Sequence, residues 1–516
     1  MGLLGLVIAG PLMAADRYIS PSGIDTNPGT LEKPWKTFSF ATGKLVAGDS
    51  LFLRAGVYSQ RFVLDGKHAT ATAPIVIRNY EKEAAIIDGS KLDVPTGDRA
   101  GLVVISNCDH IHLSGLDIRN SVTSTASRLP AGIQVLGAGT GTWVMNCKVH
   151  HIWQSTTSAN GNGFGIAVYG SAASPIDKLI LDGNEVFDLR TGSSESVVLN
   201  GNVTNFSVTN NKVHDCNNIG IDFIGFEGSN ANAALDQARG GVCSGNVIYK
   251  IDSKFNPSYG GNFSNGGGDD TRSAPGLYVD GGKDIVMERN LVYDCNFAVS
   301  VGSEHKGKVS SNVTVRDNLF HHCHVGGIVV GGSDTSNGGA ENCSFTNNTL
   351  CDNDSAGFGG GQIMIQHYVK NSVIKRNLMI STADFVQFVL KGDSTGSFAA
   401  GAIDFNLYQL RNSADFEFYW NGSAKSSFAS WKSAGSLAKD IHSSLIRTSL
   451  RLVGGTPGID AAPADFALDA GSPAINTGAA SGFPFIPTAA EKDFNNAPRL
   501  NGAHVDIGAF EFGSKP

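Results

Sequence analysis

An asparagine recurs along the central part of this chain, each time after a short run of alternating apolar and polar residues. It stands at positions 184, 211, 246, 290, 318, 348 and 377, with spacings of 27, 35, 44, 28, 30 and 29 residues. A repeat of about 20–50 residues indicates a solenoid, in which each unit buries its apolar surface only against neighbouring units. The chain is therefore expected to fold as a stack of similar coils.

The residues inside each repeat alternate with a period of two, as residues 206–216 and 285–295 show. This period predicts strands, not helices. An asparagine at a turn can hydrogen-bond to the backbone of the next coil, and stacked coils about 4.8 Å apart place identical positions in columns. With 64 Gly and only 17 Pro, the composition is turn-rich and typical of β-structure. We predict an all-β parallel β-helix.

The chain divides into four predicted segments. Residues 1–15 are apolar and end in Met-Ala-Ala, which is typical of a signal peptide. A membrane anchor is the alternative, but about 15 residues are too few to span a bilayer. Residues 16–95 form an N-terminal cap with the first coils, 96–395 form the β-helix with the active cleft, and 396–516 form the last coils and the tail. We expect a monomer that is secreted, periplasmic or on the cell surface, with no stable membrane insertion.

The cysteines and the net charge indicate which disulfides and which partners to expect. Four of the eight cysteines, at 216, 295, 323 and 351, fall at or next to one repeat position. This pattern predicts a stack of buried free thiols, with one or two disulfides left open. The net charge of −8 argues against a nucleic-acid partner.

The asparagine repeat, the N-terminal cap and the tail segments 465–476 and 505–511 together resemble the right-handed parallel β-helix proteins of the pectate-lyase-like superfamily. The resemblance implies a right-handed solenoid with an N-terminal cap and an irregular C-terminal segment. It also implies a carbohydrate ligand. It leaves the activity open, because the superfamily includes lyases, hydrolases, epimerases and adhesins.

Two of the spacings exceed the usual period of about 28 residues. The additional residues fall at 228–240 and 252–274. Long loops on a solenoid usually form a binding wall on one face. The alternative is a solvated, glycine-rich surface loop.

Aligning the coils on their inward apolar residues shows where polar side chains gather. The inward residues are Ile166, Val197, Ile221, Leu277, Val299 and Ile328. A first outward column then reads Ala167, Val198, Asp222, Tyr278, Ser300 and Val329. A second reads Tyr169, Asn200, Ile224, Asp280, Gly302 and Gly331. A third, at the turn, reads Ala172, Val203, Glu227, Lys283, His305 and Asp334. Polar groups concentrate on three consecutive coils, which predicts the position of an active cleft.

Asp222 and Asp280 lie on neighbouring coils, two residues apart in register, so their Cα atoms are expected about 8 Å apart. Two such carboxylates can share a divalent cation, or act as an acid and base with water between them. Solvation of the outer face is the alternative. We predict a calcium site formed by Asp222, Asp280, Glu227, Glu304, Asp269 and Asp270.

Lys283 is the candidate general base, because a lysine beside a cation has a lowered pKa and could remove the proton α to a uronate carboxylate. The alternative is a simple Glu–Lys surface pair. Lys306 and Arg239 are alternative bases or carboxylate clamps, and His305 shares the column of Lys283. The predicted substrate-binding residues are Tyr278, Tyr169, Asn200 and Arg272.

We therefore predict a secreted polysaccharide lyase that binds an acidic polysaccharide and cleaves it by β-elimination. The substrate would be a uronic-acid polymer, pectate-like or alginate-like. The first alternative is a glycoside hydrolase that uses Asp222 and Asp280. The second is a non-catalytic carbohydrate-binding surface protein.

Overall fold

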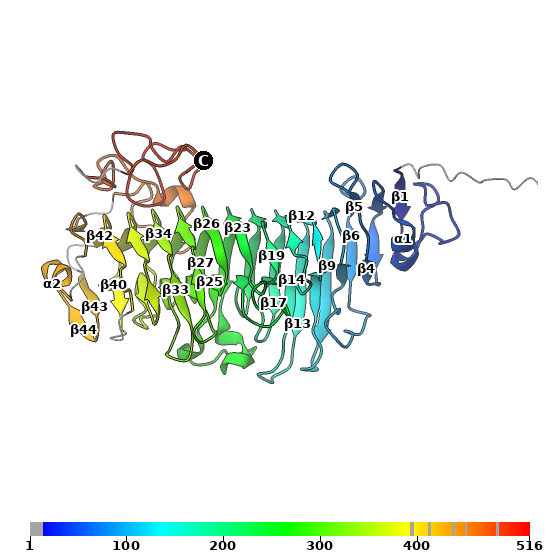
Figure 1. Cartoon of the computed structure of the whole chain (residues 1–516), viewed down its shortest axis with the longest axis horizontal. Helices are drawn as coiled ribbons and strands as arrows, with labels where there is room; N and C mark the ends of the chain where they lie inside the picture. Colours follow the sequence, from blue (N-terminus) through cyan, green and yellow to red (C-terminus); the bar gives the residue numbers. More distant parts are fainter. Residues whose placement is uncertain are drawn as a thin grey trace, which may run out of the picture.

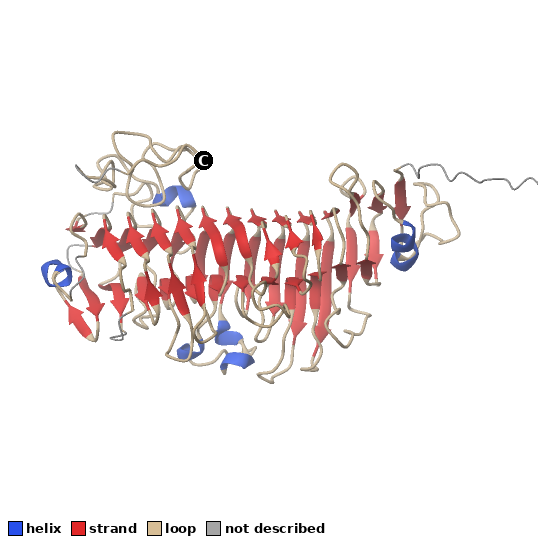
Figure 2. Cartoon of the chain, viewed as in Figure 1, coloured by secondary structure: helices blue, strands red, loops and turns tan. Residues whose placement is uncertain are grey.

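The computed structural model describes residues 14–392, 397–410, 414–435, 439–448, 451–480 and 485–515. The predicted signal peptide, residues 1–15, lies almost wholly outside the described residues. Three long parallel sheets run side by side along the molecule, and the coils stack as an elongated β-helix (Figure 1; Figure 2). The predicted fold class is thus confirmed.

The three sheets are called the cleft sheet, the back sheet and the long sheet. The cleft sheet contains β4 (Phe62–Asp65), β7 (Val103–Ser106), β10 (Ala131–Leu136), β14 (Phe164–Gly170), β18 (Val197–Gly201), β22 (Ile221–Ile224), β25 (Pro275–Asp280), β28 (Phe297–Gly302), β32 (Gly326–Val330), β36 (Ile363–Ile365), β40 (Phe385–Lys391), β43 (Asp415–Trp420) and β44 (Ser423–Lys425). The back sheet contains β3 (Gly56–Tyr58), β6 (Ala85–Asp88), β9 (Asp117–Thr123), β13 (Lys148–Gln154), β17 (Glu185–Arg190), β21 (Lys212–Cys216), β24 (Val247–Ile251), β27 (Leu291–Cys295), β31 (Leu319–His321), β35 (Thr349–Cys351), β39 (Leu378–Ser381), β42 (Leu407–Leu410) and β45 (Ser444–Arg447).

The long sheet contains the remaining strands, which are shorter because a bend divides most of its coils. They are β1 (Asp16–Ile19), β2 (Ser50–Leu53), β5 (Ile75–Asn79), β8 (Ile111–Ser114), β11 (Gly139–Thr140), β12 (Trp143–Met145), β15 (Ile176–Asp177), β16 (Ile180–Asp182), β19 (Val203–Thr204), β20 (Ser207–Thr209), β23 (Arg239–Ser244), β26 (Lys283–Glu288), β29 (Val309–Ser311), β30 (Thr314–Arg316), β33 (Gly339–Glu341), β34 (Ser344–Thr346), β37 (Val369–Lys370), β38 (Val373–Lys375) and β41 (Ala402–Asp404).

Helices are few and lie outside the solenoid. They are α1 (Phe38–Lys44), α2 (Phe428–Lys432) and the 3-10 turns η1 (Ser253–Phe255), η2 (Pro257–Tyr259), η3 (Asp269–Thr271) and η4 (Pro463–Phe466). The turns η1 to η3 belong to the long loop predicted at 252–274 and project from the solenoid at its lower edge in Figure 1. Within the described residues, no helix is both long and apolar enough to cross a membrane.

The interior is a continuous apolar column. The inward residues of the cleft sheet pair from coil to coil, Ile166 with Val197, then Ile221, Leu277, Val299 and Ile328. Each is at most 2% exposed. The predicted inward register is therefore confirmed, and it holds because a slip of one residue would turn every apolar side chain outward.

The recurring asparagines form one internal ladder at the turn between the long sheet and the back sheet. The Nδ2 of each donates to the Oδ1 of the next, at 2.9–3.0 Å, from Asn184 through Asn211, Asn246, Asn290, Asn318 and Asn348 to Asn377. The ladder then extends one rung further, to Asn406. From Asn211 onward, each amide side chain also accepts from the backbone N–H of the asparagine one coil before it, as Asn290 does from Asn246, whereas Asn184 accepts from the N–H of Cys147. The predicted column is confirmed.

All eight cysteines are free and buried, as predicted. Their register is looser than the sequence indicated, because Cys351 pairs with His321 and not with Cys323. The C-terminal segment folds back along the coils on the side opposite η1 to η3 (Figure 1). Arg499 anchors it, with Nη1 3.4 Å from Asp317 and Nε 3.4 Å from Glu511.

Candidate active site

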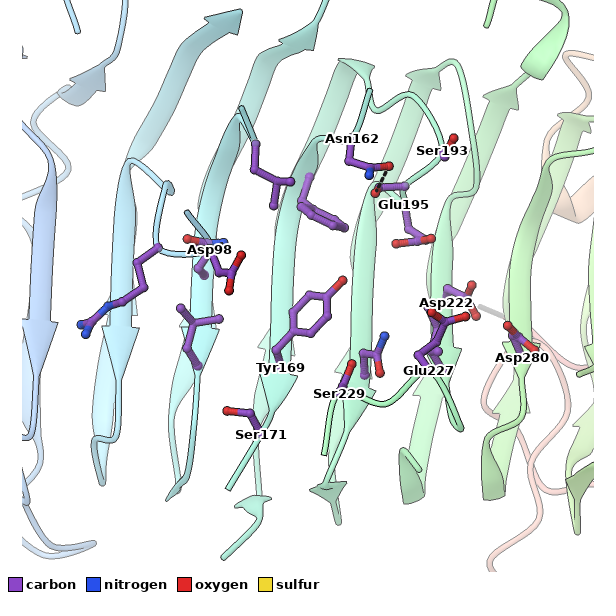
Figure 3. A pocket seen from close by; sticks show the side chains of 18 of the residues that line it. Asp98, Asn162, Tyr169, Ser171, Ser193, Glu195, Asp222, Glu227, Ser229 and Asp280 are labelled. Carbon is purple, nitrogen blue, oxygen red and sulfur yellow. Dashed lines mark hydrogen bonds between the residues drawn. The ribbon is translucent and has the colours of Figure 1, made fainter. Parts of the chain in front are cut away.

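A cleft of about 860 Å³ lies on the outer face of the cleft sheet, over β10, β14, β18 and β22. Six carboxyl groups line it, contributed by Asp98, Glu195, Asp222, Glu227, Asp280 and Glu304. Four of them gather at one end of the cleft, as Figure 3 shows for Glu195, Asp222, Glu227 and Asp280. The stretch that carries the cleft is therefore the region in which the sequence analysis found polar columns.

The strands fix the position of the first outward column. Asp222 pairs with Val198 on one side and with Tyr278 on the other, and Tyr278 pairs with Ser300. Asp280 lies two residues beyond Tyr278 and ends β25. This register is the one from which the separation of about 8 Å between the Cα atoms of Asp222 and Asp280 follows.

The turn after Asp280 requires glycine. Gly281 has φ +79°, and a Cβ at this position would lie 2.9 Å from the carbonyl oxygen of Gly225. Both facts exclude other residues without local strain. Because the chain turns sharply here, the carboxylate of Asp280 meets the backbone N–H of Glu304, which donates to its Oδ1 at 2.7 Å.

Asp222 and Asp280 are both buried, at 1% and 3% exposure. Burial, followed by the charges of Glu195, Asp280 and Glu304, raises the pKa of Asp222 well above its ordinary value. Burial and the carboxylate of Glu304 raise the pKa of Asp280 to about 8, against the smaller opposite effect of the hydrogen bond from the Glu304 N–H. Carboxyl groups in this setting keep protons at pH values where ordinary ones have lost them.

Glu195 belongs to this group, although the columns did not single it out. It is 8% exposed, and burial with the nearby charge of Glu304 raises its pKa to about 8. Its side chain was missed because it precedes β18, where alternation assigns it to the inward face. The signal available was a charged residue, in Ser-Glu-Ser, directly before an apolar strand.

A second cluster surrounds Glu227, in the turn after β22. His305 Nε2 lies 3.0 Å from Glu227 Oε1. Ligand atoms of Glu227, Asp280 and His305 all lie within 4.8 Å of one another. Tyr278 donates its hydroxyl to Glu304 at 3.4 Å. Loss of water and the carboxylate of Glu227 together raise the pKa of Glu304.

The predicted third column is wrong, and with it the place of Lys283. Lys283 begins β26 of the long sheet, where it pairs with Arg239 and Ser311 and not with Glu227 or His305. Its Nζ lies 3.9 Å from Asp284. The column failed because it extended a strand register through turns of unequal length, and only backbone pairing keeps positions aligned.

The other predicted bases also lie apart from the carboxyl groups. Arg239 donates to the carbonyl oxygens of Leu235 and Gln237 and to Asn202 Oδ1, so its guanidinium serves the loop. Lys306 is exposed in the turn after β28 and is not among the residues that line the cleft.

Three predicted residues come from the loop at 252–274. Asp270 is exposed in η3 and is not among the cleft residues, and the side chain of Asp269 lies outside the described part of the chain. Arg272 lines an adjoining cleft of about 300 Å³ together with Tyr278, Tyr259 and Glu304, and its Nε is 3.3 Å from Asp252. Because Tyr259 and Glu304 line both clefts, the two form one groove along the cleft sheet.

Uncharged side chains line the cleft between its carboxyl cluster and Asp98, which lies at the opposite end (Figure 3). They include Tyr169, Phe164 and Asn200, and the rings of Tyr169 and Phe164 meet edge to face at 5.9 Å. Asn200 is 3% exposed, and its Oδ1 has no hydrogen-bond partner. Two of the predicted substrate-binding residues, Tyr169 and Asn200, thus line the same cleft as the carboxyl groups.

The donor atoms grouped around Asp280 differ from the set that the predicted calcium ion prefers. Ca²⁺ takes six to eight oxygen ligands. The tight group supplies two carboxylates and one imidazole, a mixed oxygen and nitrogen set that is more typical of transition metals. The cleft holds further carboxyl oxygens, among them the unpartnered Oδ1 of Asp222. Calcium stays a prediction.

Comparisons with known proteins place the chain in a family. The family described as "Pel9A-like, right handed beta helix region" matches residues 17–174, and "Right handed beta helix region" matches residues 131–383. The uncharacterized protein YwoF of Bacillus subtilis (strain 168) is 34% identical over 458 residues, which cover 89% of this chain and 91% of YwoF.

Two further matches cover a smaller share of this chain than YwoF does. Pectate lyase PEL9 of Emericella nidulans is 40% identical over 82 residues, 16% of this chain and 20% of that protein. The crystal structure of the GH136 lacto-N-biosidase from Eubacterium ramulus superimposes with a TM-score of 0.55 at 16% identity, over 76% of this chain and 67% of that one. At that identity the likeness concerns the fold alone. The chain belongs to the right-handed parallel β-helix family of pectate-lyase-like proteins, whose fold is found among polysaccharide-active enzymes.

Proposed function

We propose that this protein is a glycoside hydrolase that cleaves a polysaccharide between two carboxyl groups. The observation that supports this best is the chemistry of the cleft. Its carboxyl end gathers five acidic side chains, and no lysine or arginine from the described residues lines that end. Hydrolysis of a glycosidic bond needs one carboxyl group that keeps a proton and a second that is ionised.

Asp222 is the candidate general acid. It is the more deeply buried of the pair, and burial with three neighbouring acids raises its pKa well above its ordinary value. A carboxyl group kept neutral in this way can donate its proton to the leaving glycosidic oxygen, as the scissile bond breaks.

Asp280 is the candidate partner. The N–H of Glu304 holds its Oδ1 at 2.7 Å and favours the ionised form. The ionised carboxylate would either take a proton from the attacking water or attack the anomeric carbon itself. Since the carboxyl groups interact, the cluster as a whole, and not one residue, sets how many protons are present at a given pH.

The comparisons leave the reaction type open, because the similar proteins include a pectate lyase and a lacto-N-biosidase by name. A metal-assisted lyase is therefore the second candidate, favoured by the close approach of Glu227, Asp280 and His305. In that case Glu227 and Asp280 would hold the cation that binds a uronate, and His305 beside them would be the candidate base. Lys283 does not fit that role from the long sheet.

The two candidates differ in product and in metal dependence. Purified protein is offered neutral and uronic polysaccharides, with and without chelator. A hydrolase releases reducing ends without the ultraviolet absorbance of an unsaturated uronide, and chelator leaves its rate unchanged. If the absorbance grows with turnover and disappears with chelator, the hydrolase is rejected and the lyase is supported.

Single amides test the assignment of roles. Asp222→Asn and Asp280→Asn should each lose about 10²–10⁴-fold in rate, the usual contribution of an acid or base. Asp460→Asn, at an exposed position of the C-terminal segment, is the matched control and should keep full activity. Full activity in either cleft variant would remove that residue from the mechanism.

We further propose that the protein acts as a monomer outside the cytoplasm, on the basis of the apolar stretch at residues 1–15 and the solenoid architecture. Size-exclusion chromatography and fractionation of cells that express the full chain test this. A stable dimer, or protein retained in the cytoplasm, would contradict it.

A further inference from the structure

The charged side chains of the cleft are strongly one-sided. Five carboxyl groups stand at one end, and among the described lining residues the only guanidinium or ammonium group is that of Arg99, at the other end. Arg99 is not available as a single positive charge, since its Nη2 lies 3.3 Å from Asp65. His305 is paired with Glu227 at 3.0 Å.

Arg272, in the adjoining cleft, is also paired, with Asp252 at 3.3 Å. A sugar carboxylate placed beside Asp222 or Asp280 would therefore find no unpaired cation among the described lining residues, and it would meet like charge once these acids are ionised. Two unit charges about 5 Å apart at an effective dielectric near 20 repel enough to weaken binding by roughly 100-fold or more. The cleft thus disfavours the binding of an acidic sugar, which is the kind of ligand that the family resemblance suggests.

The same cleft is well suited to an uncharged pyranose. Tyr169 and Phe164 present apolar ring surface, against which the C–H face of a sugar can pack. The buried Oδ1 of Asn200 lacks a hydrogen-bond partner, and so does the Oδ1 of Asp222. The amide oxygen accepts from a sugar hydroxyl, and the protonated carboxyl group can either donate to one or accept from one. In Figure 3, Tyr169 lies between Asp98 and the carboxyl group cluster, so one ring could contact both sets of groups.

Asn162 adds an uncharged polar group close to Glu195 (Figure 3). Its Oδ1 accepts the hydroxyl of Ser194 at 3.0 Å, which fixes the side-chain amide at the rim of the cleft. Amide and hydroxyl groups in fixed positions select hydroxyl patterns and not charge.

We propose that the sugar unit recognised beside the carboxyl groups is uncharged, a neutral pyranose of a neutral polysaccharide, with Tyr169, Asn200 and Asn162 as specificity-determining residues. This inference rests on the proposed function for its claim that the cleft is the active site. It goes beyond that proposal, because hydrolysis by two carboxyl groups does not by itself exclude a uronate.

Binding to matched pairs of oligosaccharides tests the proposal apart from turnover. Each pair has the same linkage and length and differs only at C6, as in gluco- and glucurono-, galacto- and galacturono-, or manno- and mannurono-oligosaccharides. Calorimetry or ligand-observed NMR at pH 9, where Glu195 and Asp280 are ionised, gives the affinities, first with EDTA and then with excess Ca²⁺. At least one neutral member should bind, and its acidic counterpart should bind at least about 100-fold more weakly, with or without added Ca²⁺.

A charge reversal provides the second measurement. Glu304→Lys places a cation at the carboxyl end and should raise affinity for the acidic member at least about 10-fold. Glu32→Lys changes the net charge equally at an exposed residue of the N-terminal cap and should change nothing. The proposal is overturned if an acidic member binds as tightly as its neutral counterpart, if Ca²⁺ brings it to that affinity, or if no neutral member binds at millimolar concentration.

The outcomes separate the two proposals. If neutral sugars bind with the expected preference but the protein cleaves none of them, the hydrolase is rejected and the preference for uncharged sugars is supported. Hydrolysis of a uronate polymer without metal would keep the hydrolase and reject the neutral substrate.

Discussion

The buried carboxyl group of Asp280 should destabilise the fold as pH rises, and Asp280→Asn should remove that cost. The amide is nearly isosteric, and its Oδ1 can still accept the N–H of Glu304, which donates at 2.7 Å in the wild type. What the variant lacks is the ionisation. Comparing the two proteins across pH therefore isolates the free energy of charging this site.

The sign follows from proton linkage. In the unfolded chain the carboxyl group loses its proton near its ordinary value of 3.8, whereas burial raises the folded pKa to about 8. Between these values the folded state binds more protons, so stability falls as pH rises through the window and levels off above it. Four units at about 1.4 kcal/mol each give an upper bound of about 6 kcal/mol.

Relaxation and water entry reduce such penalties, so we expect about 2–4 kcal/mol. Urea unfolding midpoints in EDTA should be equal for the two proteins at pH 4 and higher for Asp280→Asn at pH 8–9. Asp460→Asn, at an exposed site, should show no such pH-dependent gain. A variant that is less stable than the wild type at pH 8, or whose difference does not change with pH, would refute the reasoning.

Three further outcomes are expected. Asn290→Ala should cost about 3–6 kcal/mol, because it leaves buried partners in Asn246 and Cys243 unpaired at about 1–3 kcal/mol per group, while exposed Asn265→Ala should cost under 1 kcal/mol in the same urea unfolding. Lys283→Ala should keep full turnover on whichever polysaccharide is cleaved, and a loss above 10-fold would return it to the mechanism. Turnover should rise through the pKa of Asp280, about 8, because that group acts in its ionised form; a rate that is maximal at pH 5 would contradict this.

The local pattern of the sequence was sufficient for the solenoid. Side chains alternate across a strand with a period of two, and stacked coils repeat the same environment, so the inward residues from Ile166 to Ile328 and the asparagine ladder could be aligned without a structure. The first outward column also held, because Asp222 and Tyr278 lie within paired strands.

The positions of residues beyond the strand ends depended on tertiary structure. Lys283 follows Asp280 by three residues, yet the turn at Gly281 carries it into another sheet. Glu195 precedes its strand, and only the path of the turn brings it into the cleft with Asp222. Turn geometry is set by a few backbone angles that residue spacing does not encode.

The electrostatics of the site likewise came from the fold. Composition gave a net charge of −8 but could not indicate that five acids share one end of a cleft while the nearby cations are paired elsewhere. Burial and mutual repulsion, which raise the pKa of Glu195 and Asp280 to about 8, depend on distances between residues far apart in the chain. The repeat in the sequence thus determined the scaffold, whereas the turns and loops of the folded chain decided which charges meet.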